Sequence, residues 1–417
     1  MREDRDITGD RLITLDALRG FAVMGILAMN IVAFAMPEMA YVSPKAYGGE
    51  TSSDIAAWAM GFLLFDGKMR GLFSILFGAS MLLIIDRAEA NGQSPRAVHY
   101  RRMAWLAVFG LCHFFFIWWG DILFLYASVG CIAFGFRKWE ARRLIKWAIG
   151  LFTLGVVLTS LFFGAQLFIA AQADNPASPM AEAGRDVRDE YAKIDAEVTE
   201  ELALYRGPYG PILDERLGSA ANPVVGVLMT MLETLPLMML GMALFRSGFL
   251  TGSWTAEAYR RIALRWLPPG VLLTLIVGWL QWRSGFDYIV AVNAFMAWAG
   301  PGRLMMTIAY AALLVLLIRR AASSPFIARV AAAGRAAFSN YLGTSIVMTT
   351  IFYGYGLGLF GDVGRWTLYL YCAAMWAVML LWSKPWLDRY RYGPLEWLWR
   401  SLARGSLQPM KKVAPAQ

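Results

Sequence analysis

Long apolar segments recur along the chain and are separated by short polar ones. Each runs for about 17–25 residues without the alternation of a β-barrel strand, which is the length an α-helix needs to cross a bilayer. The pattern therefore predicts an all-α polytopic membrane protein with about ten transmembrane helices. We place them at 12–36, 69–86, 102–119, 121–137, 143–170, 223–245, 262–282, 303–319, 336–355 and 365–384.

Composition supports this prediction and excludes several other classes. Of the 417 residues, 58% are hydrophobic and 17% are charged, which is too apolar for a soluble protein of this length. The net charge of +9 comes from Lys and Arg in short loops, so we expect no nucleic-acid partner. Two histidines and scattered acids give no metal-ligand spacing, and we expect no metal.

Charge also predicts the orientation of the chain. Basic clusters fall in alternate connections, which places them and both termini in the cytoplasm by the positive-inside rule. The longest connection, 172–221, has 11 acidic and 5 basic residues, a net charge of −6, so the rest of the chain carries +15. Its amphipathic stretch ends at Gly207–Pro208. This stretch is either a helix that covers a cavity or a solvated excursion.

Charged side chains inside a bilayer are costly, so the few that lie in apolar segments are candidates for function. In "LDALRGFAVMGILAMN", Asp16 and Arg19 share a helical face and can pair. Asn30 lies eleven residues further, about 16 Å along a helix. Arg19 is either a clamp for a phosphate or carboxylate, oriented by Asp16, or half of a structural ion pair.

The segment "HFFFIWWGDIL" contains the second candidate group. "WWGD" predicts a tight hairpin between two spans, which would bring His113 and Asp121 onto facing helices. A carboxylate beside an imidazole fixes its tautomer, as in acyl-transfer sites. The alternative is an interior histidine bonded to a backbone carbonyl. His99 lies in a basic loop, and we expect it at the surface.

Two further groups complete the candidates for binding. Lys68 and Arg70 border a glycine-containing span near the outer surface, where snorkelling is the alternative interpretation. In "AGRAAFSNYLGTS", Arg335, Asn340 and Tyr341 lie at or inside the ninth span, and Arg335 and Ser339 should share a face. The alternative there is hydrogen bonding between helices.

The chain resembles the YeiB family of bacterial inner-membrane proteins. The resemblance rests on "LDALRGFAVMGILAMNI", "PEMAYVSPKAYGG", "LFSILFGAS", "HFFFIWWGDILFLYA", "GRAAFSNYL" and "GPLEWLWRSL", which occur in this order. It implies an inner-membrane location and a C-terminal domain of unknown function. We divide the chain into an N-terminal bundle (1–171), an extracytoplasmic loop (172–222), that C-terminal transmembrane domain (223–400) and a disordered tail (401–417).

The N-terminal bundle also looks like a wider set of transmembrane acyltransferases, which includes the heparan-alpha-glucosaminide N-acetyltransferases. Asp16, Arg19, Gly20 and Asn30 match the shared first span. This resemblance implies an acyl-CoA donor, such as acetyl-CoA, that enters from the cytoplasm. In those enzymes a histidine stands at position 30 or in the following loop. Here position 30 is Asn30, and the loop "YVSPKAYGG" has no histidine.

We therefore expect an acyltransferase that moves an acyl group to a hydroxyl or amine of a glycan or small molecule at the outer face. His113 would be the base, Asp121 its orienter, Arg19 a phosphate ligand, and Asn30 or Asn340 a donor to the oxyanion. Membrane lipid and a second copy, as a homodimer, are the further expected partners. The alternatives are a transporter or channel for a small metabolite or lipid, and a non-catalytic sensor or assembly partner.

Overall fold

The computed structural model describes residues 3–412, with side chains described from residue 13 onward. Over this range the chain forms helices and turns, and its one β-bridge is isolated. The helices of the first half are α1 (Glu3–Ala35), α2 (Glu38–Val42), α3 (Ser52–Leu64), α4 (Lys68–Ala90), α5 (Pro95–Phe116), α6 (Leu123–Ala133), η1 (Phe134–Phe136), α7 (Ala141–Ala170), α8 (Ala181–Ala192), α9 (Ile194–Tyr205) and α10 (Tyr209–Gly218).

The second half continues in the same way. Its helices are α11 (Asn222–Arg246), α12 (Ala256–Arg283), α13 (Tyr288–Asn293), the π-helix η2 (Ala294–Trp298), α14 (Gly300–Arg320), α15 (Pro325–Arg335), α16 (Ala337–Phe352), α17 (Arg365–Arg389) and α18 (Pro394–Arg404). The all-α fold class of a polytopic membrane protein is thereby confirmed.

Seven helical stretches of the described chain are long and apolar enough to cross a membrane, and each matches a predicted span. The other three predicted spans correspond to α5, to α6 with η1, and to α16. The last two are shorter than a bilayer requires, and α5 begins with the basic segment "PRAVHYRR". These three helices complete the bundle against the longer ones.

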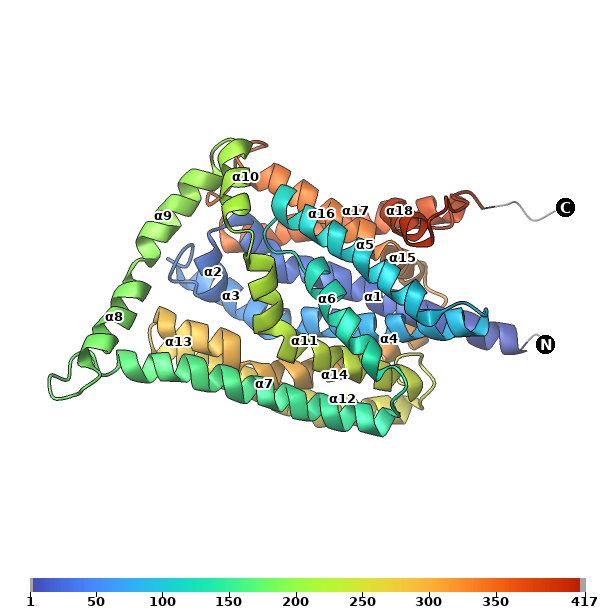
Figure 1. Ribbon diagram of the computed structural model, residues 1–417, viewed down its shortest axis with the longest axis horizontal. Coiled ribbons are helices and arrows are strands. Elements are labelled where there is room, and N and C mark those ends of the chain that lie inside the picture. Colours follow the sequence, from blue (N-terminus) through green and yellow to red (C-terminus); the bar gives the residue numbers. More distant parts are fainter. Residues whose placement is uncertain (1–2, 413–417) are drawn as a thin grey trace.

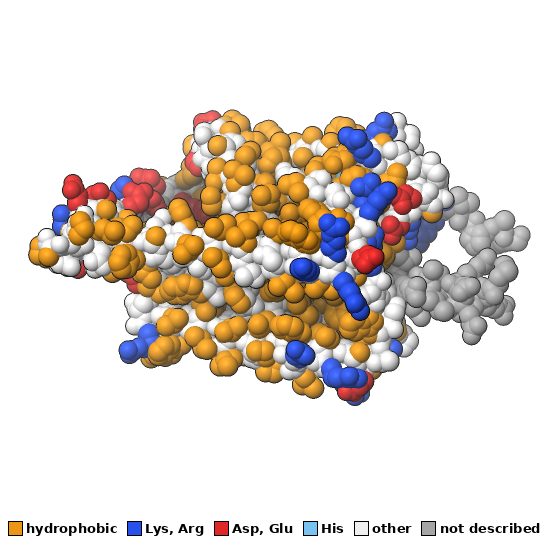
Figure 2. Space-filling view, turned by 60° about the horizontal axis from the view of Figure 1, so that its bottom comes forward, with side chains coloured by type: hydrophobic (Ala, Val, Ile, Leu, Met, Phe, Trp, Pro, Cys, Tyr) orange, Lys and Arg blue, Asp and Glu red, His pale blue; other side chains and the backbone are white. Residues whose placement is uncertain are grey.

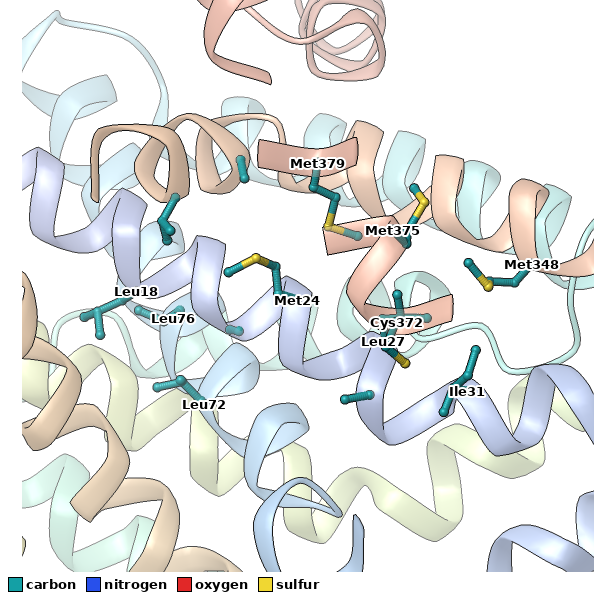
Figure 3. Packing of buried hydrophobic residues seen from close by; sticks show 14 of the residues in the cluster. Leu18, Met24, Leu27, Ile31, Leu72, Leu76, Met348, Cys372, Met375 and Met379 are labelled. Atoms are coloured by element: carbon teal, nitrogen blue, oxygen red, sulfur yellow. The ribbon is translucent and has the colours of Figure 1, made fainter. Parts of the chain in front are cut away.

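Helix α1 is the centre of the bundle and α7 lies at its edge. The apolar window of α1 is 83% buried and that of α7 only 17%. α1 packs against α4, α14, α15, α16 and α17, so the two predicted transmembrane domains share one core. Figure 3 shows this core, in which side chains of α1 meet those of α4, α16 and α17: Leu18, Met24, Leu27, Ile31, Leu72, Leu76, Met348, Cys372, Met375 and Met379.

Helices α1 and α15 pack with their backbones in direct contact. A Cβ atom built at Gly334 would overlap the carbonyl oxygen of Asp16, and one at Gly20 would overlap that of Val330. Small residues allow such backbone approach in membrane proteins. The contact brings the α1 turn that carries Asp16 beside the end of α15.

The molecule has two chemically different ends. Helix α1 begins and α18 ends at one of them, which we call the basic end, and helices α8–α10 form an arm at the other, the acidic end (Figure 1). In Figure 2, Lys and Arg side chains gather at the basic end, Asp and Glu side chains cluster at the acidic end, and an apolar belt lies between. This separation agrees with the predicted distribution of charge.

The C-terminal segment remains ordered past residue 401, where the sequence predicts a disordered tail. α18 ends at Arg404, the Trp397 indole donates to the Gln408 carbonyl at 2.6 Å, and Tyr390 pairs with Lys411 in the isolated bridge. Amphipathic packing of α18 and these backbone contacts hold the segment. Residues 413–417 lie outside the described part of the chain.

Candidate functional site

Helices α5 and α6 form the tight hairpin that "WWGD" predicts. α5 ends at Phe116 and α6 begins at Leu123. Gly110 lets the two helices touch, because a Cβ atom there would overlap the backbone nitrogen of Phe124. The end of α5 therefore lies directly against the start of α6.

This hairpin brings His113 and Asp121 into contact, as predicted. His113 Nδ1 lies 2.9 Å from Asp121 Oδ1, and Asp121 Oδ2 accepts a 2.8 Å hydrogen bond from the Phe124 backbone. The two side chains are 0% and 3% exposed. An ionised carboxylate only accepts, so Nδ1 carries the hydrogen. Nε2 keeps its lone pair and has no hydrogen-bond partner among the described atoms, which is the form a general base needs.

Two aromatic side chains cover the imidazole. The ring centroids of Tyr341 and Trp118 lie 5.2 and 6.2 Å from that of His113. Trp118 is stacked on Phe34 of α1, and the Tyr341 hydroxyl donates to the Gly120 carbonyl at 3.3 Å. A reactant reaches Nε2 only after one of these side chains moves.

A cavity of about 200 Å³ opens toward the basic end and has Tyr341 in its wall. It combines an apolar lining with four arginines and one carboxylate: Arg19, Arg102, Arg335, Arg400 and Glu396. Clustered guanidinium groups are typical of sites for phosphate and carboxylate. We refer to it as the basic cavity.

The predicted Asp16–Arg19 pair is confirmed and supports this cavity. Arg19 Nη1 donates to Asp16 Oδ1 at 2.9 Å, and Nη2 donates to the Ser80 hydroxyl at 2.9 Å. Ser80 also lines the cavity. Asp16 and Ser80 thus fix the Arg19 guanidinium at the wall.

His99 is buried, so its predicted surface position is wrong. It is 3% exposed, its Nε2 lies 3.0 Å from the Gly130 carbonyl oxygen, and its ring is stacked on Phe134. The basic segment that suggested a loop is the first part of α5, whose inner face packs on α6 and η1. Arg102 of the same helix lies over the Trp399 ring at 4.1 Å.

A larger cavity, of about 920 Å³, opens toward the acidic end. Asn30 and Asp121 lie in its wall, as do Arg70 and Arg216. Five carboxylates of α2, α9 and α10 surround its outer part: Glu38, Glu197, Glu200, Glu201 and Glu215. We refer to it as the acidic cavity. The predicted amphipathic helix ending at Gly207–Pro208 forms two helices, α8 and α9, that join at Lys193. Of these two, α9 lines the acidic cavity and α8 packs against α7.

The basic and acidic cavities meet at Ile122. This residue lies in the wall of both, one position after Asp121 and just before α6. Along α1, Arg19 faces the basic cavity and Asn30 the acidic one. Asp121 lines the acidic cavity beside Ile122. His113 lines neither cavity, but its ring contacts Tyr341 in the wall of the basic cavity and Trp118 in the wall of the acidic cavity.

Two other predicted binding residues lie elsewhere in the described chain. Lys68 is fully buried, donates to the Phe62 carbonyl at 2.5 Å and lines neither cavity. The Asn340 amide donates to the Ala333 carbonyl and the Ser383 hydroxyl, while its oxygen accepts from the Trp382 indole. These partners hold α16 against α15 and α17.

Arg335 and Ser339 do not share a helical face, which corrects that prediction. α15 ends at Arg335 and α16 begins at Ala337, so the helix is interrupted between them. Arg335 reaches the basic cavity. The Ser339 hydroxyl instead donates to Glu396 of α18 at 2.6 Å.

Arg70, which borders the same span as Lys68 in the sequence, lies in the wall of the acidic cavity, and its Nη2 donates to both carboxylate oxygens of Glu233, at 2.8 and 3.0 Å, across α4 and α11. Sequence reasoning missed three other arginines of these cavities. Arg102, Arg400 and Arg216 lie in segments that read as ordinary basic or amphipathic helices. Their one signal is an arginine on the apolar face of such a helix, and only the packing of distant helices shows that the face lines a cavity.

Comparison with known proteins places the chain among relatives without an assigned activity. The family described as "Protein of unknown function (DUF418)" matches residues 244–406. "Uncharacterized protein YeiB" of Escherichia coli (strain K12) is 30% identical over 407 residues, which cover 96% of this chain and 98% of the relative. "Uncharacterized protein YxaH" of Bacillus subtilis (strain 168) is 30% identical over 418 residues and 97% of each chain.

Proposed function

The chain belongs to the YeiB family, and from this premise we propose that it is a membrane acyltransferase. It moves an acyl group from acyl-CoA in the basic cavity to a hydroxyl or amine acceptor in the acidic cavity. The observation that carries this proposal is the His113–Asp121 pair, with Nε2 of His113 unbonded, between Tyr341 in the wall of the basic cavity and Trp118 in the wall of the acidic cavity.

The residues present suit each step of the transfer. The acceptor gives its proton to His113 Nε2 while its oxygen or nitrogen attacks the thioester carbonyl carbon. The carbon–sulfur bond then breaks, and the imidazolium returns the proton to the leaving thiolate, which departs as the free thiol. Asp121 holds the ring and stabilises the transient imidazolium. Tyr341 or Trp118 must rotate to expose Nε2.

The charge of the basic cavity supports the assignment of the donor to it. Arg19, Arg102, Arg335 and Arg400 offer several guanidinium groups to the phosphates of a nucleotide thioester. Apolar side chains of α4 continue from there toward Tyr126 and would contact the acyl arm. For the oxyanion, Asn30 is the better donor of the two predicted asparagines, because the Asn340 amide already bonds two oxygen atoms.

We assign the basic end to the cytoplasm of a bacterium and the acidic end to the outer side of its inner membrane. Lys and Arg concentrate at the end where α1 begins and α18 ends, and the positive-inside rule favours the cytoplasm for that end. Membrane lipid surrounds the apolar belt in this arrangement, and a homodimer stays a prediction.

A transporter is the second candidate, and one observation favours it. Two cavities that open at opposite ends and share one wall residue, Ile122, also resemble a translocation path with a closed gate. Such a protein would move a metabolite or lipid unchanged, whereas the acyltransferase forms a covalent product.

The experiment that separates the two uses the purified chain in proteoliposomes. Acetyl-CoA with a labelled acetyl group is supplied at the basic end, with glucosamine or ethanolamine at the acidic end. We expect labelled product and free CoA thiol. In His113→Ala the rate of acetyl transfer should be at least about 100-fold lower. Cys112→Ala, an exposed neighbour on α5, is the matched control and should keep the rate.

Two outcomes would overturn the proposal. Full activity of His113→Ala would show that His113 is not the base. Failure of the chain to bind acetyl-CoA would exclude acetyl-CoA as the donor. Flux of an unmodified solute without any acetylated product would favour the transporter.

A further inference from the structure

Arg216 is a buried cation without a counterion. It lies on α10 in the wall of the acidic cavity and is 1% exposed. None of its three guanidinium nitrogens has a hydrogen-bond partner among the described residues, and it forms no ion pair there. An unpaired buried charge is strongly unfavourable, so such a group usually awaits a partner that the chain itself does not supply.

The carboxylates of the same cavity lack cations. No described Lys or Arg forms an ion pair with Glu38, Glu197, Glu200, Glu201 or Glu215. Two of them lie close together, because the Glu38 backbone N–H donates to Glu201 Oε2 at 2.7 Å. The acidic cavity therefore contains an excess of negative charge. Of the two arginines in its wall, Arg70 pairs with Glu233, whereas Arg216 has no hydrogen-bond partner among the described residues.

We propose that the acidic cavity binds a zwitterion. Its anionic group, a phosphate or carboxylate, pairs with Arg216 after a rotation of the arginine side chain, and its ammonium group lies among Glu38, Glu197 and Glu201. An anion alone would add charge to an already negative cavity, and a cation alone would leave Arg216 unpaired. A molecule that carries both charges satisfies both sets of groups.

The size of the cavity connects this site with the proposed transfer. At about 920 Å³ it exceeds the volume of a small zwitterion, and its wall extends from Arg216 to Asp121. The acceptor would carry the two recognition charges at one part and the hydroxyl or amine to be acylated at another. This identification of the zwitterion as the acceptor rests on the proposed function, whereas the binding itself does not.

The zwitterion could come from a membrane lipid or from solution, and these two sources can be distinguished. The start of α11 adjoins the cavity and exposes Leu228 and Met229, which are 62% and 63% accessible and suit contact with lipid. The zwitterion is therefore either the headgroup of an aminophospholipid that enters sideways or a soluble molecule that enters from the acidic end.

Binding to the full chain in nanodiscs of phosphatidylglycerol tests the proposal without any acyl donor. The probes are phosphoethanolamine and β-alanine, which carry both charges, and ethanolamine and inorganic phosphate, which carry one each. We expect one of the zwitterions to bind at least about tenfold more tightly than either single-charge probe. Weaker binding in nanodiscs that contain phosphatidylethanolamine identifies the lipid as the source, and unchanged binding identifies a soluble molecule.

Substitutions show which residues are responsible for the preference for a zwitterion. Arg216→Met should abolish the preference for the zwitterion, Arg216→Lys should weaken it, and Glu201→Gln should lower affinity about tenfold. Arg188→Gln and Glu190→Gln, exposed residues of the same arm, are matched controls and should bind normally. Melting temperatures show that each variant is folded. If a folded Arg216→Met protein still prefers the zwitterion, Arg216 has no part in binding.

Other outcomes overturn the proposal as directly. If inorganic phosphate or ethanolamine binds as tightly as the zwitterions, the cavity recognises a single charge. The absence of binding by every probe in both kinds of nanodisc also contradicts it. Zwitterion binding without acyl transfer would overturn only the proposed function, and acyl transfer to a neutral acceptor without zwitterion binding would overturn only this inference.

Discussion

Asp121 contacts two groups, the His113 imidazole and the backbone of α6, so a substitution of Asp121 should have two separate effects. One carboxylate oxygen orients His113 and the other caps the first turn of α6 through the Phe124 backbone. The side chain therefore links the geometry of the base to the position of the helix that carries it. A substitution should affect the chemistry and the stability to different degrees.

Asp121→Asn should separate these two effects. The amide can still cap α6, so we expect a loss of only about 1 kcal/mol in the free energy of unfolding. It no longer stabilises an imidazolium or fixes the tautomer, so kcat should fall by roughly 10³-fold with little change in KM. Acetyl-transfer kinetics and thermal melting measure the two. A kcat close to that of the wild type would show that His113 needs no orienter.

Arg216→Met should make the protein more stable in the absence of ligand. It replaces a buried guanidinium that has no hydrogen-bond partner by an apolar side chain of similar length. We expect a gain of about 1–3 kcal/mol, seen as a higher melting temperature. A large loss of stability would mean that the guanidinium is satisfied in the native protein. The exposed control Arg188→Met should change the melting temperature little.

The residue scale also shows where sequence reasoning succeeds. The contact between His113 and Asp121 follows from a short hairpin, because eight residues of local sequence fix the distance. The pairing of Asp16 with Arg19 follows from one turn of helix. Arg216 and Glu201 could not be assigned in this way, because the cavity that they line is completed by α2 and other segments far along the chain.

At the scale of elements, a single carboxylate joins α18 to the start of α16. Glu396 accepts hydrogen bonds from the backbone N–H groups of Phe338 and Ser339, at 2.7 and 3.0 Å, and from the Ser339 hydroxyl. It thereby caps the start of α16 with a side chain of another helix. The same docking keeps Arg400 and Trp399 in the wall of the basic cavity.

Glu396→Gln should loosen α18. The glutamine offers one acceptor oxygen where the carboxylate has two, and its NH₂ group faces a backbone donor. We expect a loss of about 1–3 kcal/mol and faster cleavage by trypsin near Arg400 and Arg404. Glu257→Gln, which removes an exposed carboxylate of α12, is the control and should change neither quantity. Unchanged proteolysis of Glu396→Gln would mean that apolar contacts alone hold α18.

The arm at the acidic end should respond to pH. Burial, with a smaller contribution from the nearby carboxylates and against the Glu38 backbone hydrogen bond, raises the pKa of Glu201 from 4.5 to about 7. Between these values the folded protein keeps a proton that the unfolded chain has lost. The resulting stability is fully present below pH 4.5 and is lost as the pH rises through 7. Charged and titratable groups near Glu201 are Glu38, Glu197, Glu215, Tyr205, Tyr288 and Arg216.

Melting temperatures between pH 5 and pH 8.5 test this dependence. The wild type should lose up to roughly 3 kcal/mol over this range from Glu201, and Glu201→Gln should show a shallower profile. Glu190→Gln alters an exposed carboxylate of α8 and should follow the wild type. A profile of Glu201→Gln that matches the wild type would assign the proton to another group.

Element boundaries also show why prediction from sequence was incomplete. The long apolar helices follow directly from hydropathy, and seven of the ten predicted spans correspond to helical stretches that are both long and apolar enough to cross a membrane. The interruption between α15 and α16 leaves no such mark, because "AGRAAFSNYLG" is uniformly compatible with helix. The break is fixed by Glu396, which caps α16 from a position 57 residues beyond Ser339.

At the scale of the whole molecule, we expect residues of the two cavities to be accessible to reagents from opposite sides of the membrane. Arg335 and Glu200 are both exposed, one in the wall of the basic cavity and the other in that of the acidic cavity. In a chain whose three native cysteines are replaced by serine, Arg335→Cys should react with an impermeant thiol reagent from the cytoplasmic side only. Glu200→Cys should react from the outer side only. Labelling of both from one side would contradict the proposed orientation.

In a membrane that carries a voltage, the position of Ile122 between the two cavities affects where that voltage falls. Aqueous cavities on both sides of a thin partition concentrate the transmembrane voltage across it, where an elementary charge gains about 2.3 kcal/mol per 100 mV. An acetyl group is neutral and would pass this partition without electrical work. An ion carried along the same route would be driven or retarded by the voltage, so the response of turnover to an imposed diffusion potential reports whether charge crosses at Ile122.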